Sequence, residues 1–319
     1  MADILNGDDG GDDIFVYMGG QAPRDVRRAK IDESIDTIPL GVFANCQQLI
    51  EVEGHKKLMK MEGSAFVRCR SLRRLMKMNV VREIEDGAFA GCHALKDLDF
   101  DKLEIVGFAA FARCSLRSIN LPSVRRVGHS AFAGCTQLTD AVFSEDLERI
   151  ERRAFHDSAL RRIAIPLKDN FVIDLNAFSR CRNLSRVDVV GGIHKTISSL
   201  HMENWRDDVK EEIESINQTL PDTLSSEMSA TINQWIRSVL RDMEHYKTEH
   251  KVLLKEAMML LELALWKAKL LDEEGRKCEA EEKMSLKAKI DKERTRKEYR
   301  VTCGANIVIK NVLPFLALK

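Results

Sequence analysis

The sequence predicts an α/β repeat solenoid of short parallel strands, followed by an all-α helical module. Two observations support this prediction. After Gly191-Gly192 apolar residues recur every three or four positions, which is the spacing of a helix face. Before that point one short phrase recurs, with a small or apolar residue before a Phe, usually a Cys three residues later and a Leu five or six later, at Phe43, Phe66, Phe89, Phe111, Phe132, Phe155 and Phe178.

The period of this phrase is nearly constant. The intervals between successive Phe residues are 23, 23, 22, 21, 23 and 23, within the range of roughly 20 to 50 residues that is typical of stacked repeats. Each unit opens with an alternation such as Leu116-x-x-Ile119-x-Leu121, which predicts a short strand with its apolar residues inward. Because one turn cannot bury its apolar side alone, neighbouring turns must share a core. We therefore expect the Phe side chains to form one buried row.

The unit Leu-x-x-[Leu/Ile]-x-[Leu/Phe] … Ala-Phe-x-x-Cys-x-x-Leu resembles the BspA-like, bacterial-surface-antigen type of leucine-rich repeat. The resemblance covers roughly residues 26–190. Departures from it include Ser158 in place of a Cys, Lys77 at an inward strand position and a longer insertion at Pro166–Asp174. The resemblance implies a curved stack whose strand face binds other macromolecules.

Composition and patterning divide the chain into five expected parts. They are a disordered acidic arm (1–13), an N-terminal cap with the solenoid (14–195), a helical hairpin (196–271), a charged helix or linker (272–300), and an apolar tail that packs on the helices or on a partner (301–319). Residues 24–196 hold 29 basic and 23 acidic side chains, a net charge of +6. This excess is smaller than a nucleic-acid-binding domain normally carries.

An apolar stripe predicts one long amphipathic helix in the second half of the hairpin. It runs through Ile232, Trp235, Val239, Met243, Tyr246, His250, Leu253, Ala257, Leu261, Ala264 and Ala268. The stripe widens to an apolar patch at Met258–Leu265. We expect this patch to supply a second contact or a surface for self-association.

No pattern predicts a catalytic, cofactor-binding or metal site. The repeat cysteines lack the two-to-four-residue spacing of zinc pairs, and we interpret them as small buried packing residues. The phosphate-binding, dinucleotide-binding and nucleophile-elbow motifs do not occur. The protein is therefore expected not to be an enzyme and to bind no cofactor. An N-terminus without a secretory signal and the absence of a long uninterrupted apolar run lead us to expect an intracellular protein, cytoplasmic rather than nuclear, with reduced thiols.

The strand positions that alternate with the inward apolar residues are the candidate partner-binding surface. Their charge changes sign from turn to turn, which favours a protein partner over a phosphate backbone, since phosphates would require one sign along the groove. Alternatively, these side chains serve only solubility. The candidate residues are Arg28, Lys30, Glu51, Glu53, Arg74, Met76, Asp97, Asp99, Ser118, Asn120, Asp140, Arg162, Arg186 and Asp188.

The sequence leaves two further hypotheses for the function. One is an enzyme or cofactor-binding protein with its site in the C-terminal helical half, which would need convergent polar groups in a pocket. The other is binding of acidic ligands or nucleic acid through a basic edge made by Arg125-Arg126, Arg152-Arg153 and Arg161-Arg162. The favoured hypothesis is a non-enzymatic scaffold that binds proteins through its strand face.

Overall fold

The structure is a computed structural model that describes residues 14–191 and 203–281. The chain divides into two compact units. The first joins Met1–Ile193 with Asp207–Leu240, and the second joins His194–Arg206 with Arg241–Lys319. The first unit is the solenoid with the helices that close its end. The expected disordered arm (1–13) and apolar tail (301–319), and most of the charged segment (272–300), lie outside the described residues.

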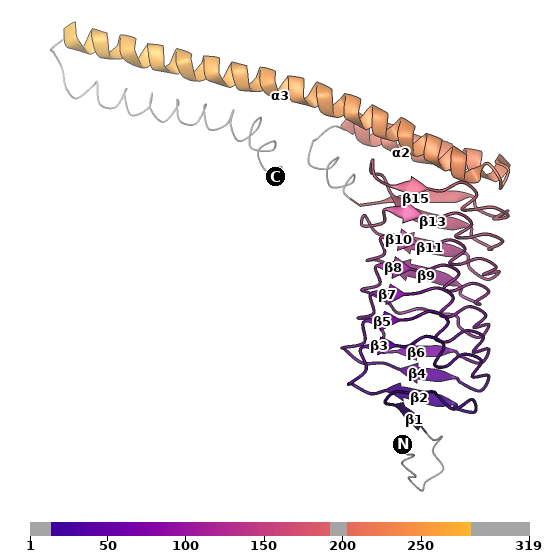
Figure 1. Ribbon diagram of the computed structural model, residues 1–319. Helices are drawn as coiled ribbons and strands as arrows, with labels where there is room; N and C mark the ends of the chain where they lie inside the picture. The colour runs from indigo at the N-terminus through magenta and orange to yellow at the C-terminus, as the bar shows by residue number, and fades with distance from the viewer. Residues whose placement is uncertain (1–13, 192–202, 282–319) are drawn as a thin grey trace. The chain divides into compact units, whose positions relative to one another are not determined.

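Most turns of the solenoid begin with a strand on one side of the stack, and all neighbouring strands run parallel (Figure 1). These strands form two sheets in which consecutive turns lie side by side. The first contains β1 (Ile14–Tyr17), β2 (Arg28–Ile31), β4 (Glu51–Glu53) and β6 (Arg74–Met76), and the second contains β9 (Ser118–Leu121), β11 (Asp140–Phe143), β13 (Arg162–Pro166) and β15 (Arg186–Val190). The alternation seen in the sequence thus corresponds to real strands with buried inward residues.

A third sheet, which the sequence did not indicate, runs along another side of the stack. Its seven members are two-residue strands, too short for apolar alternation to reveal them. They are β3 (Thr37–Ile38), β5 (Lys60–Met61), β7 (Glu83–Ile84), β8 (Ile105–Val106), β10 (Arg126–Val127), β12 (Arg149–Ile150) and β14 (Val172–Ile173). The second residue of each strand is buried and extends the core that the Phe residues occupy.

The seven Phe rings form the predicted row. Neighbouring rings are stacked with centroids 5.0–5.8 Å apart and planes inclined by 1–18°. All seven rings are fully buried, and the ring of Tyr17 lies on Phe43 at the N-terminal end, 5.4 Å between centroids. The fold class is therefore confirmed as a parallel-strand solenoid followed by helices.

Each Phe lies between two residues in the left-handed backbone conformation, one two positions before it and one two positions after it. For Phe111 these are Ala109 (φ 50°) and Arg113 (φ 59°). The same pair of positive φ values flanks each of the other six Phe residues. The two left-handed positions bend the backbone sharply on both sides of the ring and turn the Phe into the core. Most residues there carry a side chain, so the packing has to offset the strain.

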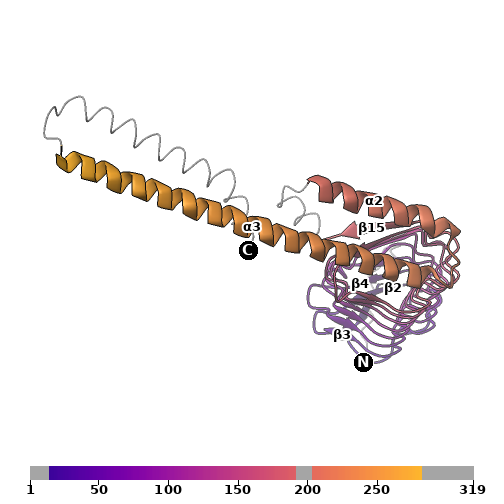
Figure 2. The same cartoon turned by 90° about the horizontal axis from the view of Figure 1, so that it is seen from above.

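Two helices close the C-terminal end of the stack (Figure 2). α2 (Glu203–Thr219) is followed by a 3-10 turn (Leu220–Asp222) and by α3 (Met228–Glu281). The side-chain oxygen of Asn217 accepts a hydrogen bond from Val187 N of β15 (2.7 Å), and the side-chain amide of Asn233 donates to Ile173 O of β14 (2.7 Å). Polar groups of the last turn that would otherwise lack partners are thereby satisfied.

Apolar contacts complete this C-terminal cap. Val209, Ile216, Ile232 and Val239 are buried, and the indole N–H of Trp235 donates to a backbone carbonyl of α2. The first part of the predicted apolar stripe is therefore a packing surface for the solenoid and for α2.

Within the second unit, α3 continues as an unbroken helix to Glu281. Its described part carries large apolar side chains that are more than half exposed, namely Val252, Leu253, Met258, Met259, Leu260, Leu263, Leu265 and Trp266. Among the described residues, no helix is both long and apolar enough to span a bilayer.

Candidate functional site: the strand face

We call the outward surface of β1, β2, β4, β6, β9, β11, β13 and β15 the strand face. The strand pairing places its residues in two columns. In the first turns Arg28, Glu51 and Arg74 follow one another in one column, and Lys30, Glu53 and Met76 in the other. In the last turns the columns are Ser118, Asp140, Arg162 and Arg186, and Asn120, Val142, Ala164 and Asp188. The strand pairing therefore aligns the predicted residues within each sheet, and Asp97 and Asp99 follow in the segment between β6 and β9.

In the first turns the strand-face charges pair with each other across the strands. Glu51 lies between Arg28 and Arg74, with a nitrogen of each at 3.6 Å from its carboxylate. Glu53 accepts a hydrogen bond from Lys77 at 2.5 Å, and this hydrogen bond is the main cause of its lowered pKa. Alternating sign along the stack thus neutralises this part of the face internally.

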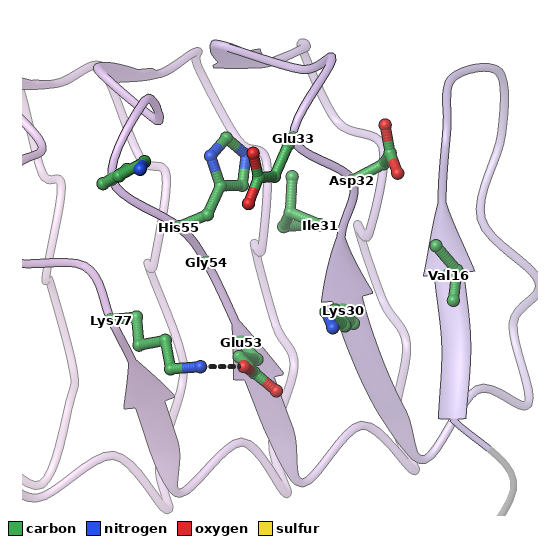
Figure 3. A pocket seen from close by; sticks show the side chains of 10 residues that line it. Val16, Lys30, Ile31, Asp32, Glu33, Glu53, Gly54, His55 and Lys77 are labelled. Atoms are coloured by element: carbon green, nitrogen blue, oxygen red, sulfur yellow. Dashed lines mark hydrogen bonds and ion pairs between the residues drawn. The ribbon is translucent and has the colours of Figure 1, made fainter.

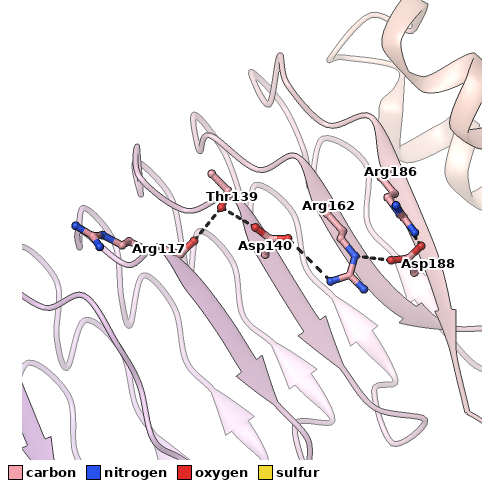
Figure 4. Close-up of polar contacts among 6 residues, drawn as sticks. All are labelled: Arg117, Thr139, Asp140, Arg162, Arg186 and Asp188. Atoms are coloured by element: carbon pink, nitrogen blue, oxygen red, sulfur yellow. Dashed lines mark hydrogen bonds and ion pairs between the residues drawn. The ribbon is translucent and has the colours of Figure 1, made fainter.

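The last turns show the same arrangement (Figure 4). Asp140 lies 4.0 Å from Arg162, and Asp188 accepts hydrogen bonds from Arg162 and from Arg186. Partial burial acts to raise the pKa of Asp188, but these hydrogen bonds outweigh it and the pKa is lowered. The hydroxyl of Thr139 links the carboxylate of Asp140 to the backbone carbonyl of Arg117.

The middle of the strand face differs from both ends. β6 ends one sheet and β9 begins the next, and the segment between them, 95–100, is not a strand. Within the described part of the chain, no backbone hydrogen bond joins residues 97–100 to the turn before or after. Asp97 and Asp99 are exposed there and form no ion pair with any described residue. The strand face therefore has a central acidic break with unpaired charge.

The hollow drawn in Figure 3 lies at the carboxyl ends of β2, β4 and β6. It has a volume of about 470 Å³ and opens widely to solvent. Its carboxylates already have partners: Glu53 pairs with Lys77, Glu33 with Lys57 at 3.5 Å, and Asp32 accepts hydrogen bonds from Ser34. The Ser34 hydrogen bonds lower the pKa of Asp32.

His55 lines the same hollow and is only 8% exposed. Its Nδ1 accepts a hydrogen bond from Lys57 N (3.2 Å), whereas its Nε2 has no partner among the described residues. Lys30 also forms no ion pair there. Among the described residues that line the hollow, no nucleophile lies beside a base that could activate it. The described residues include no group of three or more metal-ligating side chains.

Lys77, directly after β6, does not lie where the sequence predicted. It was expected to point inward, but its side chain is exposed and pairs with Glu53. The backbone of Lys77 is left-handed (φ 57°), so the next residue, Met78, enters the core instead and is fully buried. A Cβ at Gly54 would lie 2.7 Å from the Met78 sulfur, so the absence of a side chain at Gly54 gives Met78 its room.

The repeat cysteines form a buried column on another side of the turns. The thiol of Cys69 donates to Phe43 O (2.9 Å), that of Cys92 to Phe66 O (3.1 Å), and Cys114, Cys135 and Cys181 continue the pattern. Burial raises the pKa of Cys69 and of Cys135 to about 12. The neutral thiol is a poor nucleophile. These residues therefore pack and donate hydrogen bonds rather than react.

The three basic pairs considered from the sequence do not lie on one edge. Arg126 begins β10 on the third sheet, directly after Arg125. Arg125 lies 3.8 Å from Glu148, and Arg126 lies 3.9 Å from Glu151. Arg162, by contrast, begins β13 on the strand face. The stacking thus separates residues whose sequence motifs look alike.

The repeats match a known family. The family model of the BspA type leucine rich repeat region, in six copies, matches residues 24–124 and 104–210. The chain belongs to this family. Repeats of the BspA type typically mediate binding or protein interaction. In this member of the family, hydrogen bonds from the Cys thiols to the Phe carbonyls join successive turns, and Lys77 is a local departure from the repeat pattern.

Several solved structures of leucine-rich repeat and related proteins are similar to part of this chain. A leucine-rich cell surface protein of Faecalibacterium prausnitzii is 26% identical over 50% of this chain and 38% of its own, with a TM-score of 0.38. The leucine-rich repeat protein of T. pallidum is 20% identical over 60% and 88%, and the pneumococcal vaccine antigen PcpA 17% over 56% and 40%, with TM-scores of 0.38 and 0.39. This chain therefore spans well under half the length of the first and the third. Among curated proteins there is no significant match.

Proposed function

We propose that this protein is a non-catalytic scaffold that recognises a protein partner through its strand face, with the acidic break at residues 95–100 as the centre of the contact. The observation that carries the proposal is the difference between the break and its surroundings. Ion pairs between neighbouring turns neutralise most charges on either side, whereas Asp97 and Asp99 are exposed and unpaired within the described chain. Unpaired charge is available to set the register of a partner.

The surroundings of the break fit a protein contact. Met76, which is 36% exposed, lies on the neighbouring strand β6, and Ser118 and Asn120 are exposed on β9. The surface thus offers two carboxylates beside an apolar group and neutral hydrogen-bonding groups. The backbone amides of 97–100 add donors that no neighbouring turn uses. A partner segment with Lys or Arg and free main-chain carbonyls would satisfy both.

The experiment is an affinity purification of the tagged full-length chain from its native cells, with bound proteins quantified by mass spectrometry. The test variant is Asp97→Lys with Asp99→Lys. The matched control is Asp146→Lys with Asp169→Lys, which makes the same charge change in exposed connecting loops. We expect a specific partner whose recovery falls about tenfold or more in the test variant only. Equal recovery with both variants would show that the break is not the recognition surface.

We also propose that α3 supplies a self-association surface. The exposed residues Val252, Met259, Leu263 and Trp266 are spaced by seven, four and three, the spacing of a coiled-coil seam. Two copies would bury these side chains against each other and remove an exposed apolar stripe from water. Light scattering on the full chain should then show a dimer that Met259→Glu with Trp266→Glu dissociates. A control at exposed Leu224→Glu should leave the dimer intact, and a strict monomer at high concentration rejects this proposal.

We further propose that the protein works inside the cell, as expected from the sequence. The six repeat cysteines are free thiols, which suits a reducing compartment. Fractionation of the native cells, followed by detection of the untagged chain, tests this directly.

A further inference from the structure

A second surface lies where each turn passes from the Phe-x-x-Cys segment to the next strand. We call it the corner edge. It consists of residues 68–73, 91–96, 113–117, 134–139, 157–161 and 180–185. Backbone hydrogen bonds hold these segments in register: Arg68 N bonds to the next turn at Ala90 O, and Arg113 N to Ala133 O. Nearer the strands, Arg117 N bonds to Lys96 O. The corner edge is thus a continuous strip along the stack.

The corner edge is strongly basic. It carries one acidic side chain, Asp157, and nine basic ones, all exposed: Arg68, Arg70, Arg73, Lys96, Arg113, Arg117, Arg161, Arg180 and Arg182. Successive turns of a parallel stack are about 4.8 Å apart, so cations of adjacent turns lie close together. The net charge of the 24–196 region, +6, hides this concentration because the acidic residues lie elsewhere.

None of these nine cations has a partner in the described part of the chain. Among the described residues, no ion pair or hydrogen bond is formed by the side-chain nitrogens of any of them. The cations of the third sheet behave differently: Arg82 pairs with Glu104 at 2.5 Å, and Arg149 with Asp174 at 2.6 Å. The solenoid therefore pairs many of the charges on its sheet faces, whereas the corner-edge cations are unpaired within the described residues. Figure 4 shows the Arg117 guanidinium pointing away from Asp140 and from the ion pairs of the strand face.

The arginine stems are supported along the stack. A Cβ at Gly91 would lie 3.5 Å from Arg68 Cγ, and one at Gly134 would lie 3.2 Å from Arg113 Cγ. The two arginine stems therefore lie against the backbone of the following turn. A stem that rests on backbone loses less freedom when its guanidinium binds. The arginine side chains of the corner edge are thus partly preorganised to bind an anionic ligand.

Two classes of polyanion could occupy such a strip. Single-stranded nucleic acid usually binds on aromatic side chains that stack with its bases, and the corner edge contains no Phe, Tyr or Trp. In an extended polypeptide alternate side chains lie roughly 6.5–7 Å apart, and Arg pairs well with carboxylates. We propose that the corner edge binds an extended Asp/Glu-rich segment of a partner protein.

The test is a fluorescence anisotropy titration of the full-length chain with fluorescein-labelled deca-glutamate at physiological salt. The test variant is Arg73→Gln with Arg117→Gln. The matched control is Arg126→Gln with Arg149→Gln, which removes the same charge from the third sheet. We expect about tenfold weaker binding in the test variant and less than about twofold in the control. Circular dichroism melts establish that both variants fold. A second test variant, Arg68→Gln with Arg113→Gln, changes the first residues of two corner-edge segments instead of the last.

Three results would overturn the proposal. The first is no binding by the unmodified chain. The second is equal weakening by test and control variants, which would mean attraction by net charge alone. The third is a labelled oligothymidylate or DNA duplex that binds more tightly than the peptide and loses affinity in the corner-edge variant, which would assign the strip to nucleic acid. The corner edge is separate from the strand face. The peptide titration therefore tests the corner edge independently of the affinity purification with the Asp97 and Asp99 variant.

Discussion

The thiol of Cys114 donates a hydrogen bond to the backbone carbonyl of Phe89, 3.2 Å away in the preceding turn. This bond joins two residues that recur in the repeat. The same carbonyl accepts a backbone hydrogen bond from Cys92 N (3.1 Å) within its own turn, so the thiol of the next turn adds a second hydrogen bond that links the two turns. Where Ser158 replaces the Cys, its hydroxyl contacts the Cys181 thiol at 3.3 Å and stays buried.

Truncation of a ring in the Phe row should be costly. Phe111→Ala removes a fully buried ring that stacks on Phe89 and on Phe132. We expect the free energy of unfolding to fall by about 3–5 kcal/mol, measured by urea denaturation. Phe108→Ala is the control, since that ring is 52% exposed, and its cost should stay below about 1 kcal/mol. Similar losses at both positions would mean that the row is not the core.

The left-handed positions offer a stabilising substitution. Ala109 has φ 50°, where an L side chain is strained and Gly is not. Ala109→Gly should therefore raise the free energy of unfolding by up to about 1 kcal/mol. The half-buried Ala112, which is outside the left-handed region, provides the comparison: Ala112→Gly should lower it by about 0.5–1 kcal/mol. If thermal melts show the same sign for both, the backbone geometry described for the bend is incorrect.

The cysteine column predicts a pH dependence. Burial raises the folded-state pKa of Cys135 to about 12 from the usual 9.0, so the unfolded thiol ionises first. The contribution of Cys135 to stability is complete below about pH 9 and is lost as the pH rises toward 12. The six repeat thiols should resist iodoacetamide in the native protein at pH 8.5 and react in urea, as read by peptide mass spectrometry. Rapid native alkylation of Cys135 would contradict this.

The C-terminal cap should depend on one amide side chain. Asn217→Ala leaves Val187 N of β15 without its acceptor, which should cost about 1–3 kcal/mol. Gln218→Ala, at the exposed neighbouring position, should change the unfolding free energy by less than about 0.5 kcal/mol. The hydrogen-exchange rate of the Val187 amide is a second measurement. An unchanged rate in the Asn217 variant would show that α2 does not stabilise β15 through this hydrogen bond.

The sequence predicted the features that recur in every repeat, but it did not predict the contacts that depend on how neighbouring turns are aligned. The Phe row and the strands of the strand face follow directly from the period and from the alternation of apolar residues. The third sheet escaped because a two-residue strand has no alternation to detect. Lys77 was misplaced because one left-handed residue shifts the alternation, and neither its own identity nor that of Met78 signals this.

The candidate site was predictable in position but not in chemistry. Sequence placed Glu51 and Arg74 on the strand face, but only the pairing of β4 with β6 shows that they neutralise each other. The corner edge was invisible for the same reason. Arg73, Lys96 and Arg117 stand more than twenty residues apart in unremarkable loop positions, and only the stacking brings them together. Asn217 and Asn233, which hold the cap, also have no sequence signal.

Site-specific photo-crosslinking in the native cells tests the central claim most directly. A photoreactive benzoylphenylalanine replaces Asn120, which is exposed on β9 beside the acidic break, or Asn170, which is exposed in the loop after β13. We predict a discrete protein adduct from position 120 that is lost when Asp97 and Asp99 are changed to Lys, and no such adduct from position 170. An adduct at position 170 without one at position 120, or an adduct at 120 that the Lys changes leave intact, would contradict recognition through the strand face.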